Sequence, residues 1–101
     1  MIYEVRFQTI DPARREEYVA LYSAAIQDIK KAGAHSVQVL CSDDDPSAVL
    51  VLAEWDTREQ HQRWRQSPER ARFREAVEGS GLQIKPGTGG YYEGGYVVFG
   101  G

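Results

Sequence analysis

Two side chains that can take part in chemistry, His61 and Trp64, lie three residues apart in the segment 49–77, VLVLAEWDTREQHQRWRQSPERARFREAV. Residues at this spacing on a helix project from nearly the same face, so both point into the space between the helix and whatever it covers. An imidazole can accept or release a proton near neutral pH, and an indole can stack on an aromatic ligand. The spacing therefore predicts a pocket at this helix without naming its ligand.

Other residues that often mark functional sites give weaker signals. Cys41 is the only cysteine, which excludes an internal disulfide and a cysteine-based zinc site, and its place in a predicted strand favours a small apolar residue over a nucleophile. The aspartates at 43–45 are too few to surround a calcium ion and favour a turn. The glycines of residues 86–95 lack the spacing of a phosphate-binding loop. We expect no metal site.

Arginine is concentrated between Arg58 and Arg74, and acidic residues are interleaved with it from Asp56 to Glu78. This mixture is typical of a solvated, salt-bridged helix face, and we prefer that interpretation to a phosphate site. The net charge of the whole chain is only −3, so nothing requires a nucleic acid or an anionic membrane as a partner.

The length of 101 residues predicts one domain, residues 1–101, whose stability an oligomer would help. The opening residues, MIYEVRFQTI, lack the basic region and the apolar run of a signal peptide. No segment approaches the ~20 apolar residues of a membrane span. We therefore expect a cytoplasmic protein that does not enter a membrane.

The elements that must position the pocket follow from periodicity. Residues 2–10 alternate, with Tyr3, Val5, Phe7 and Thr9 on one face, as in a strand with one apolar side. Apolar residues at intervals of three and four predict a helix that is capped by Asp11, runs to about Ala32 and ends at Gly33. Strands are predicted for 36–42 and for the continuous apolar run that ends at Trp55.

The second half of the chain contains a broken helix. Ser67 can cap a new helix with Pro68 at its first position, so the helical segment divides into 57–66 and 68–78. Residues 82–86 suggest a short edge strand, and 96–99 (YVVF) the final strand. The Gly-rich segment 86–95 then forms a mobile or bulged approach to that last strand.

The order strand, helix, strand, strand, helix, strand predicts a ferredoxin-like βαββαβ fold of the α+β class, with a four-stranded antiparallel sheet and both helices on one face. The third strand carries Leu50 and Leu52 on one side and Val49 and Val51 on the other. The uncovered face would be too apolar for water, so we expect a homodimer packed through it.

The segment from Trp55 onward resembles the antibiotic biosynthesis monooxygenase family. The resemblance lies in a strand that ends in Trp55, a helix that opens with Thr57, an aromatic residue at Trp64 and the pair Ser67 and Pro68. It spans most of the chain and implies a dimeric α+β barrel.

The resemblance also implies a chemistry, in which an electron-rich phenol or quinol loses a proton and passes an electron to dioxygen without a cofactor. Trp64 would stack on the ring, His61 would take the phenolic proton, Gln60 or Arg65 would hold the oxyanion, and Tyr22 would close the other side. The set of site candidates is thus His61, Trp64 and Gln60 as catalytic residues and Tyr22, Arg65 and Phe7 as binding residues for a small aromatic ligand.

Several alternatives stay open. The residue types alone favour core packing for Trp64 and Tyr22 and a surface or hydrogen-bonded core position for His61. The haem-degrading branch of the family fits poorly, because Arg74 occupies the position of its axial histidine and Val5 lies near that of its asparagine. The same fold could also serve a non-catalytic binding or stress-related module, or a polyketide cyclase.

Overall fold

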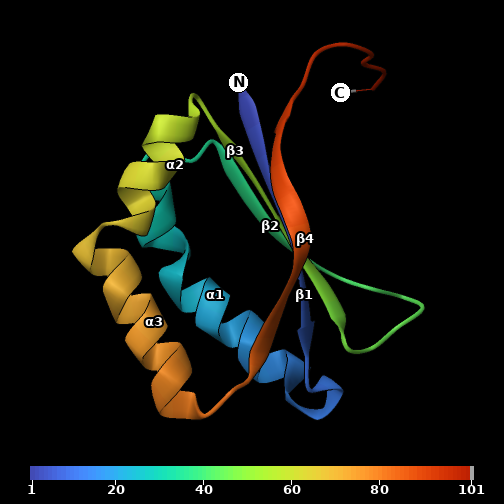
Figure 1. Ribbon diagram of the computed structural model, residues 1–101, viewed down its shortest axis with the longest axis vertical. Coiled ribbons are helices and arrows are strands. Elements are labelled where there is room, and N and C mark those ends of the chain that lie inside the picture. Colours follow the sequence, from blue (N-terminus) through green and yellow to red (C-terminus); the bar gives the residue numbers. More distant parts are fainter. Residues whose placement is uncertain (101) are drawn as a thin grey trace.

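The computed structural model describes residues 1–100. Within them, four strands form one antiparallel sheet in the order β2-β3-β1-β4, with bounds β1 (Ile2–Ile10), β2 (Ser36–Cys41), β3 (Ala48–Trp55) and β4 (Ile84–Glu93). The helices α1 (Arg15–Lys31), α2 (Arg58–Arg65) and α3 (Pro68–Ser80) cover one face of the sheet (Figure 1). This arrangement confirms the predicted ferredoxin-like α+β fold.

β3 lies inside the sheet, and its alternation separates the two faces. Val49, Val51, Ala53 and Trp55 point toward the helices and are buried. The residues between them, including Leu50 and Leu52, are half-buried because no helix covers their side of the sheet. Within one chain, β3 is therefore fully buried on its helix-facing side only.

β1 turns its polar side toward the helices. Glu4 pairs with Ala53 and Arg6 with Val51, so these two polar residues share the helix-facing side with the buried residues of β3. Phe7, on the opposite side, remains 48% exposed. A half-buried strand usually turns its apolar side to the core, so this inversion places charged groups inside the molecule.

The first helical segment begins as a 3-10 turn. Asp11 accepts a hydrogen bond from the backbone nitrogen of Ala13, and the turn η1 (Pro12–Arg14) leads directly into α1. The helix-facing stripe of α1 is buried as the periodicity predicted, and Gly33 adopts a left-handed φ of 110° beyond its end.

The predicted break between α2 and α3 is confirmed. The hydroxyl of Thr57 accepts from the backbone nitrogen of Gln60 at 3.2 Å, and that of Ser67 accepts from the nitrogen of Arg70 at 3.1 Å. Pro68 occupies the first turn of α3, where its missing N–H costs no helical hydrogen bond. α3 then ends at Gly81, which has a φ of 73°.

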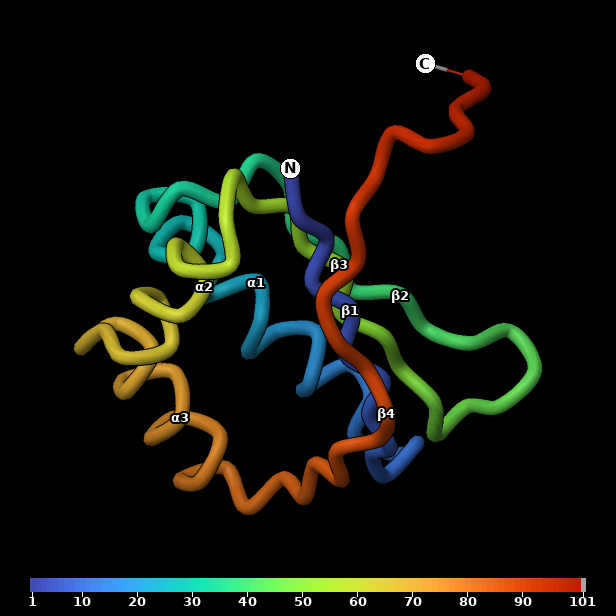
Figure 2. The backbone as a smooth tube through the Cα atoms, turned by 45° about the horizontal axis from the view of Figure 1, so that its top comes forward, coloured from blue at the N-terminus to red at the C-terminus, as the bar shows by residue number. Residues whose placement is uncertain are grey.

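The last strand lies earlier in the chain than the sequence predicted. β4 comprises Ile84–Glu93 and pairs along β1 with a bulge opposite residues 6–8, whereas Tyr96–Phe99 form no strand. Glycine is required where the two strands approach closely, because a β-carbon on Gly89 would collide with the carbonyl oxygen of Val5. Beyond β4 the chain leaves the sheet and runs away from the helices, so residues 96–99 have no strand to pair with (Figure 2).

Candidate functional site

A cavity of about 650 Å³ lies between the helices and the sheet. Val51, Ala53 and Trp55 of β3 contribute its apolar floor, and Glu4, Arg6 and Gln8 of β1 contribute the polar part. A shallower groove of about 300 Å³ follows the seam between β1 and β4 and shares Glu4, Arg6 and His61 with the cavity. The inverted polarity of β1 therefore supplies the polar groups of the site.

A chain of hydrogen bonds links Glu4, His61 and Tyr91 across three elements. His61, on α2, is only 2% exposed. Its Nε2 lies 3.1 Å from the carboxylate of Glu4 on β1, and its Nδ1 lies 2.5 Å from the hydroxyl of Tyr91 on β4. Because the carboxylate can only accept, Nε2 carries a proton, and in the neutral ring Nδ1 accepts the hydroxyl proton of Tyr91.

Glu4 is the charged end of this chain. Burial alone would raise the pKa of Glu4, but the hydrogen bond from His61 and the positive charge of Arg6 outweigh it and hold the pKa below its ordinary value. Arg6 forms an ion pair with the same carboxylate, and the indole nitrogen of Trp55 donates to it at 3.1 Å. Glu4 is therefore an ionised carboxylate that contacts Arg6, His61 and Trp55, and its negative charge lies beside the His61 ring.

Aromatic side chains form the helical wall of the cavity. Tyr22 of α1 packs against Phe73 of α3, with ring centroids 4.8 Å apart, and both residues line the cavity. Burial raises the pKa of Tyr22, so its hydroxyl stays protonated and can donate a hydrogen bond. Trp64 also lines the cavity but is only 8% exposed and belongs to the core cluster around Ala53 and Trp55.

The structure brings four of the six sequence-predicted residues to the cavity, namely His61, Trp64, Tyr22 and Arg65. Gln60 is not among the lining residues in the described chain. Its side-chain oxygen accepts from the backbone nitrogen of Asp56 at 3.0 Å, and its amide packs against Gly33. One helical step of about 100° separates neighbouring residues, so Gln60 and His61 cannot face the same space.

Phe7 likewise lies away from the cavity. It projects from the bare face of the sheet, opposite Glu4 and Arg6, and borders only the shallow groove between β1 and β4. The alternation of side chains along a strand explains this, since odd and even residues of β1 point to opposite faces.

Sequence reasoning missed Glu4 and Tyr91. The signal for Glu4 was present, because a central strand with Glu4, Arg6 and Gln8 on one face has polar groups that need interior partners. Tyr91 gave no comparable signal, because the glycines around it hide the alternation of β4.

The arginine-rich helix face is solvated as expected, since all its arginines except Arg70 are exposed, but the expected salt bridges are not found among residues 1–100. In the described chain, no ion pair involves any arginine between Arg58 and Arg74. Arg65, Arg70 and Arg74 line the cavity instead. Burial lowers the pKa of Arg70, and the neighbouring charges of Arg74, Arg6 and Arg65 lower it further.

Two further features of residues 1–100 concern sites considered above. No group of three or more histidine, cysteine, aspartate or glutamate side chains is placed to hold a metal ion, and the aspartates at 43–45 belong to the hairpin turn, where Asp45 accepts from Ser47. None of the helices in this part of the chain is both long enough and apolar enough to span a membrane.

The structure is that of a ferredoxin-like protein with a cavity between helices and sheet that aromatic side chains line in part. Residues 1–76 match the antibiotic biosynthesis monooxygenase family, and the chain belongs to this family. No curated protein matches the sequence.

Solved structures share the fold. The chain is similar to a candidate antibiotic biosynthesis monooxygenase from Bordetella bronchiseptica, with a TM-score of 0.80 and 23% identity over 92% of this chain and 95% of that one. It is also similar to SnoaB, a cofactor-independent oxygenase from Streptomyces nogalater, with a TM-score of 0.77 and 15% identity over 96% and 95% of the two chains. A candidate monooxygenase from Nitrosomonas europaea gives a TM-score of 0.73 and 18% identity over 95% and 100%.

Proposed function

We propose that this protein oxidises a small aromatic or polyketide-like quinol or anthrone with dioxygen and needs no cofactor. The observation that carries the proposal is the buried chain from Glu4 through His61 to Tyr91, which lies where the aromatic-walled cavity meets the groove beside β4. Family membership and the fold shared with the oxygenase SnoaB support the same reaction class.

In this proposal the substrate ring lies in the cavity against Tyr22 and Phe73, and its acidic group reaches Tyr91. Tyr91 passes its own proton to Nδ1 of His61 as it accepts the substrate proton, and Glu4 stabilises the imidazolium that forms. His61 thus acts through Tyr91, because both of its nitrogens already have partners in the protein.

The redox step is carried by the substrate. The anion transfers one electron to dioxygen, and the resulting radical pair combines into a peroxide. Loss of water then converts the reacting CH₂ of an anthrone into C=O, with one oxygen atom in the product and the other in water. The substrate supplies all the electrons, so the protein has only to bind it, remove its proton and exclude water.

The test is oxygen uptake by the purified protein, in the presence of a chelator, against a panel of anthrones and naphthoquinols. We expect uptake above the rate of autoxidation and a loss of about a hundredfold or more in Tyr91→Phe and His61→Asn. Tyr92→Phe and His35→Asn are matched controls, because Tyr92 lies on the bare face and His35 pairs with Asp56 on the surface. Equal rates of oxygen uptake in Tyr91→Phe and wild type would contradict proton transfer through Tyr91 to His61.

A non-catalytic binding module is the second candidate. The observation that favours it is that each ring nitrogen of His61 already has a protein partner, as in a structural core histidine. Tight binding of the aromatic panel without oxygen uptake would support this function. A polyketide cyclase would instead convert a linear precursor without consuming oxygen, so product mass separates these cases.

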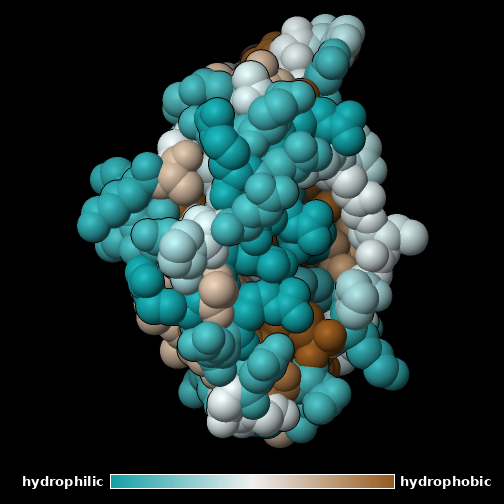
Figure 3. All heavy atoms as spheres, turned by 60° about the vertical axis from the view of Figure 1, so that its left-hand side comes forward, coloured by the Kyte–Doolittle hydropathy of each residue, from teal (hydrophilic) through white to brown (hydrophobic). Residues whose placement is uncertain are grey.

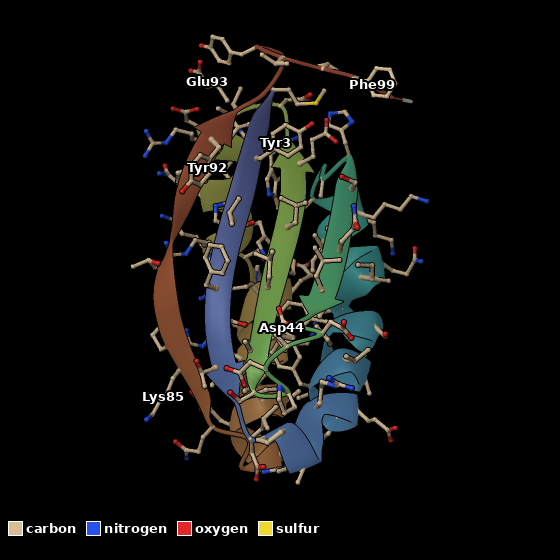
Figure 4. The ribbon with its side chains drawn as sticks, turned by 90° about the vertical axis from the view of Figure 1, so that its right-hand side faces the viewer. Tyr3, Asp44, Lys85, Tyr92, Glu93 and Phe99 are labelled. Atoms are coloured by element: carbon tan, nitrogen blue, oxygen red, sulfur yellow. The ribbon has the colours of Figure 1, made fainter. Side chains whose placement is uncertain are left out.

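We also propose that a second copy of the chain packs on the bare face of the sheet. Tyr3 and Tyr92 lie on neighbouring strands of this face (Figure 4), and Phe7, Leu40 and Tyr92 are 48%, 40% and 56% exposed. A sheet face with this many exposed large apolar side chains favours association, and the side chains from two such faces could form a common core.

A further inference from the structure

Three arginines from the corner between α2 and α3 meet at one side of the cavity. Arg65 lies in the last turn of α2, Arg70 in the first turn of α3, and Arg74 one turn later. Arg70 and Arg74 are four residues apart and share a helix face, and the break at Ser67–Pro68 turns α3 so that Arg65 lines the same cavity. The face formed by the helices is mostly hydrophilic, with apolar atoms showing only in small areas (Figure 3).

Few carboxylates of the described residues lie near these three arginines to balance their charge. The cavity is lined by four arginines but only two glutamates, Glu4 and Glu78. Glu4 is already engaged by Arg6, His61 and Trp55. Neither Glu78 nor any other carboxylate of the described residues forms an ion pair with Arg65, Arg70 or Arg74.

This local excess of positive charge is unfavourable without a ligand. Arg70 is half-buried, whereas Arg65 and Arg74 are exposed. Burial lowers the pKa of Arg70, and the charges of Arg74, Arg6 and Arg65 lower it further. The chain as a whole carries a net charge of −3, so a general surplus of basic residues does not account for the cluster. A bound anion would relieve the repulsion and accept charge-assisted hydrogen bonds, for which guanidinium groups are well suited.

The surroundings restrict the anion to one on an aromatic molecule. Arg70 lines the same cavity as Tyr22 and Phe73, whose rings pack against each other and form its aromatic wall. Arg65 lines both the cavity and the groove near Tyr91. A ligand could therefore place its ring against the aromatic wall and its acidic group on the arginines while its other end reaches Tyr91.

We propose that Arg65, Arg70 and Arg74 bind a carboxylate on the substrate, which makes aromatic carboxylic acids the substrate class of this cavity. That the ligand is a substrate rests on the proposed function, whereas binding of a carboxylate by these arginines does not require turnover.

The experiment compares the binding of 2-naphthoate and 2-naphthamide, which have nearly the same shape and differ in charge, by calorimetry of the intact protein. We expect naphthoate to bind about tenfold or more tightly than naphthamide, and Arg70→Gln to remove this preference. Arg70→Lys keeps the positive charge but loses the planar guanidinium group, so this variant should retain part of the preference for naphthoate. Arg72→Gln is the matched control, because exposed Arg72 lies on α3 without lining the cavity.

Equal binding of the two probes, no binding of either, or an equal loss in Arg72→Gln and Arg70→Gln would overturn the proposal. Circular dichroism of each variant confirms that it is folded. Tighter binding of naphthoate without oxygen uptake would support the anion site and contradict the oxygenase. Oxygen uptake on neutral quinols with equal binding of the two probes would support the oxygenase and contradict the anion site.

Discussion

At the scale of single residues, the site depends on a pairing that the sequence indicates only in part. The spacing of His61 and Trp64 correctly placed both on one helix face toward the sheet. It could not show that His61 meets Glu4 and Tyr91, which lie 57 residues before it and 30 residues after it in the chain, because only the fold brings these residues together. Gln60 was proposed as a holder of the oxyanion, but it neighbours His61 on the helix and so faces another direction, away from the cavity.

The lowered pKa of Glu4 gives a prediction for pH. A carboxyl group whose pKa is lower in the folded state stabilises the fold above its ordinary pKa of 4.5, and this stabilisation is lost as the pH falls through the lowered value. Glu4→Gln removes the charge that Arg6 and His61 face, so we expect a loss of about 3 kcal/mol in the free energy of unfolding near neutral pH.

Urea denaturation at several pH values measures both effects. Below the ordinary pKa of Glu4, the stability of wild type should fall more steeply than that of Glu4→Gln, so that the two curves converge in acid. Glu16→Gln, at an exposed position of α1, should follow wild type throughout. Parallel curves for wild type and Glu4→Gln would show that Glu4 contributes nothing to the acid dependence.

At the scale of elements, the break between α2 and α3 was predictable from the sequence, and the pairing of the glycine-rich strand β4 with β1 was not. Ser67 and Pro68 combine a cap oxygen with a residue that favours the first helical turn, so local chemistry alone marks the break. β4 approaches β1 so closely at Gly89 that a side chain there would collide with Val5, so glycine is required. The apolar segment Tyr96–Phe99 has the pattern of a strand but no neighbouring strand to pair with. Strand pairing is a property of two segments, and one segment alone does not reveal it.

The helix cap at Ser67 lies at the corner between α2 and α3 that carries the three arginines, and its contribution to stability can be tested separately. Ser67→Ala removes the hydroxyl that accepts from the backbone nitrogen of Arg70, and we expect a loss of about 1 kcal/mol in the free energy of unfolding. Ser23→Ala, at an exposed position inside α1, should be neutral or slightly stabilising because alanine favours helices. An unchanged free energy of unfolding in Ser67→Ala would show that the break does not depend on this cap.

At the scale of the whole molecule, the two faces of the sheet have separate roles. One carries the cavity and its polar groups, and the other exposes aromatic and aliphatic side chains that a second copy would cover. The sequence predicted the apolar character of the bare face from the two-sided pattern of β3. It could not show that the polar side of β1 would be the interior one, because alternation separates two faces without saying which of them the helices cover.

The proposed dimer predicts the effect of a charge on the bare face. Leu50→Asp places a carboxylate among the apolar side chains of this face, and burial of an unpaired charge should dissociate the dimer. Light scattering after size exclusion should report a dimer for wild type and for Gln62→Asp, which alters exposed α2, and a monomer for Leu50→Asp. A Leu50→Asp protein that remained a dimer would remove this interface.

The most direct test of the oxygenase itself is the fate of isotopically labelled dioxygen. The protein would be incubated under labelled dioxygen with the anthrone that gives the highest uptake, with a chelator present, and the product analysed by mass spectrometry. We expect one labelled oxygen atom in each product molecule, formed by wild type and Tyr92→Phe but only at the rate of autoxidation by Tyr91→Phe. Product without label, or labelled product formed equally well by Tyr91→Phe, would contradict an oxygenase that works through Tyr91.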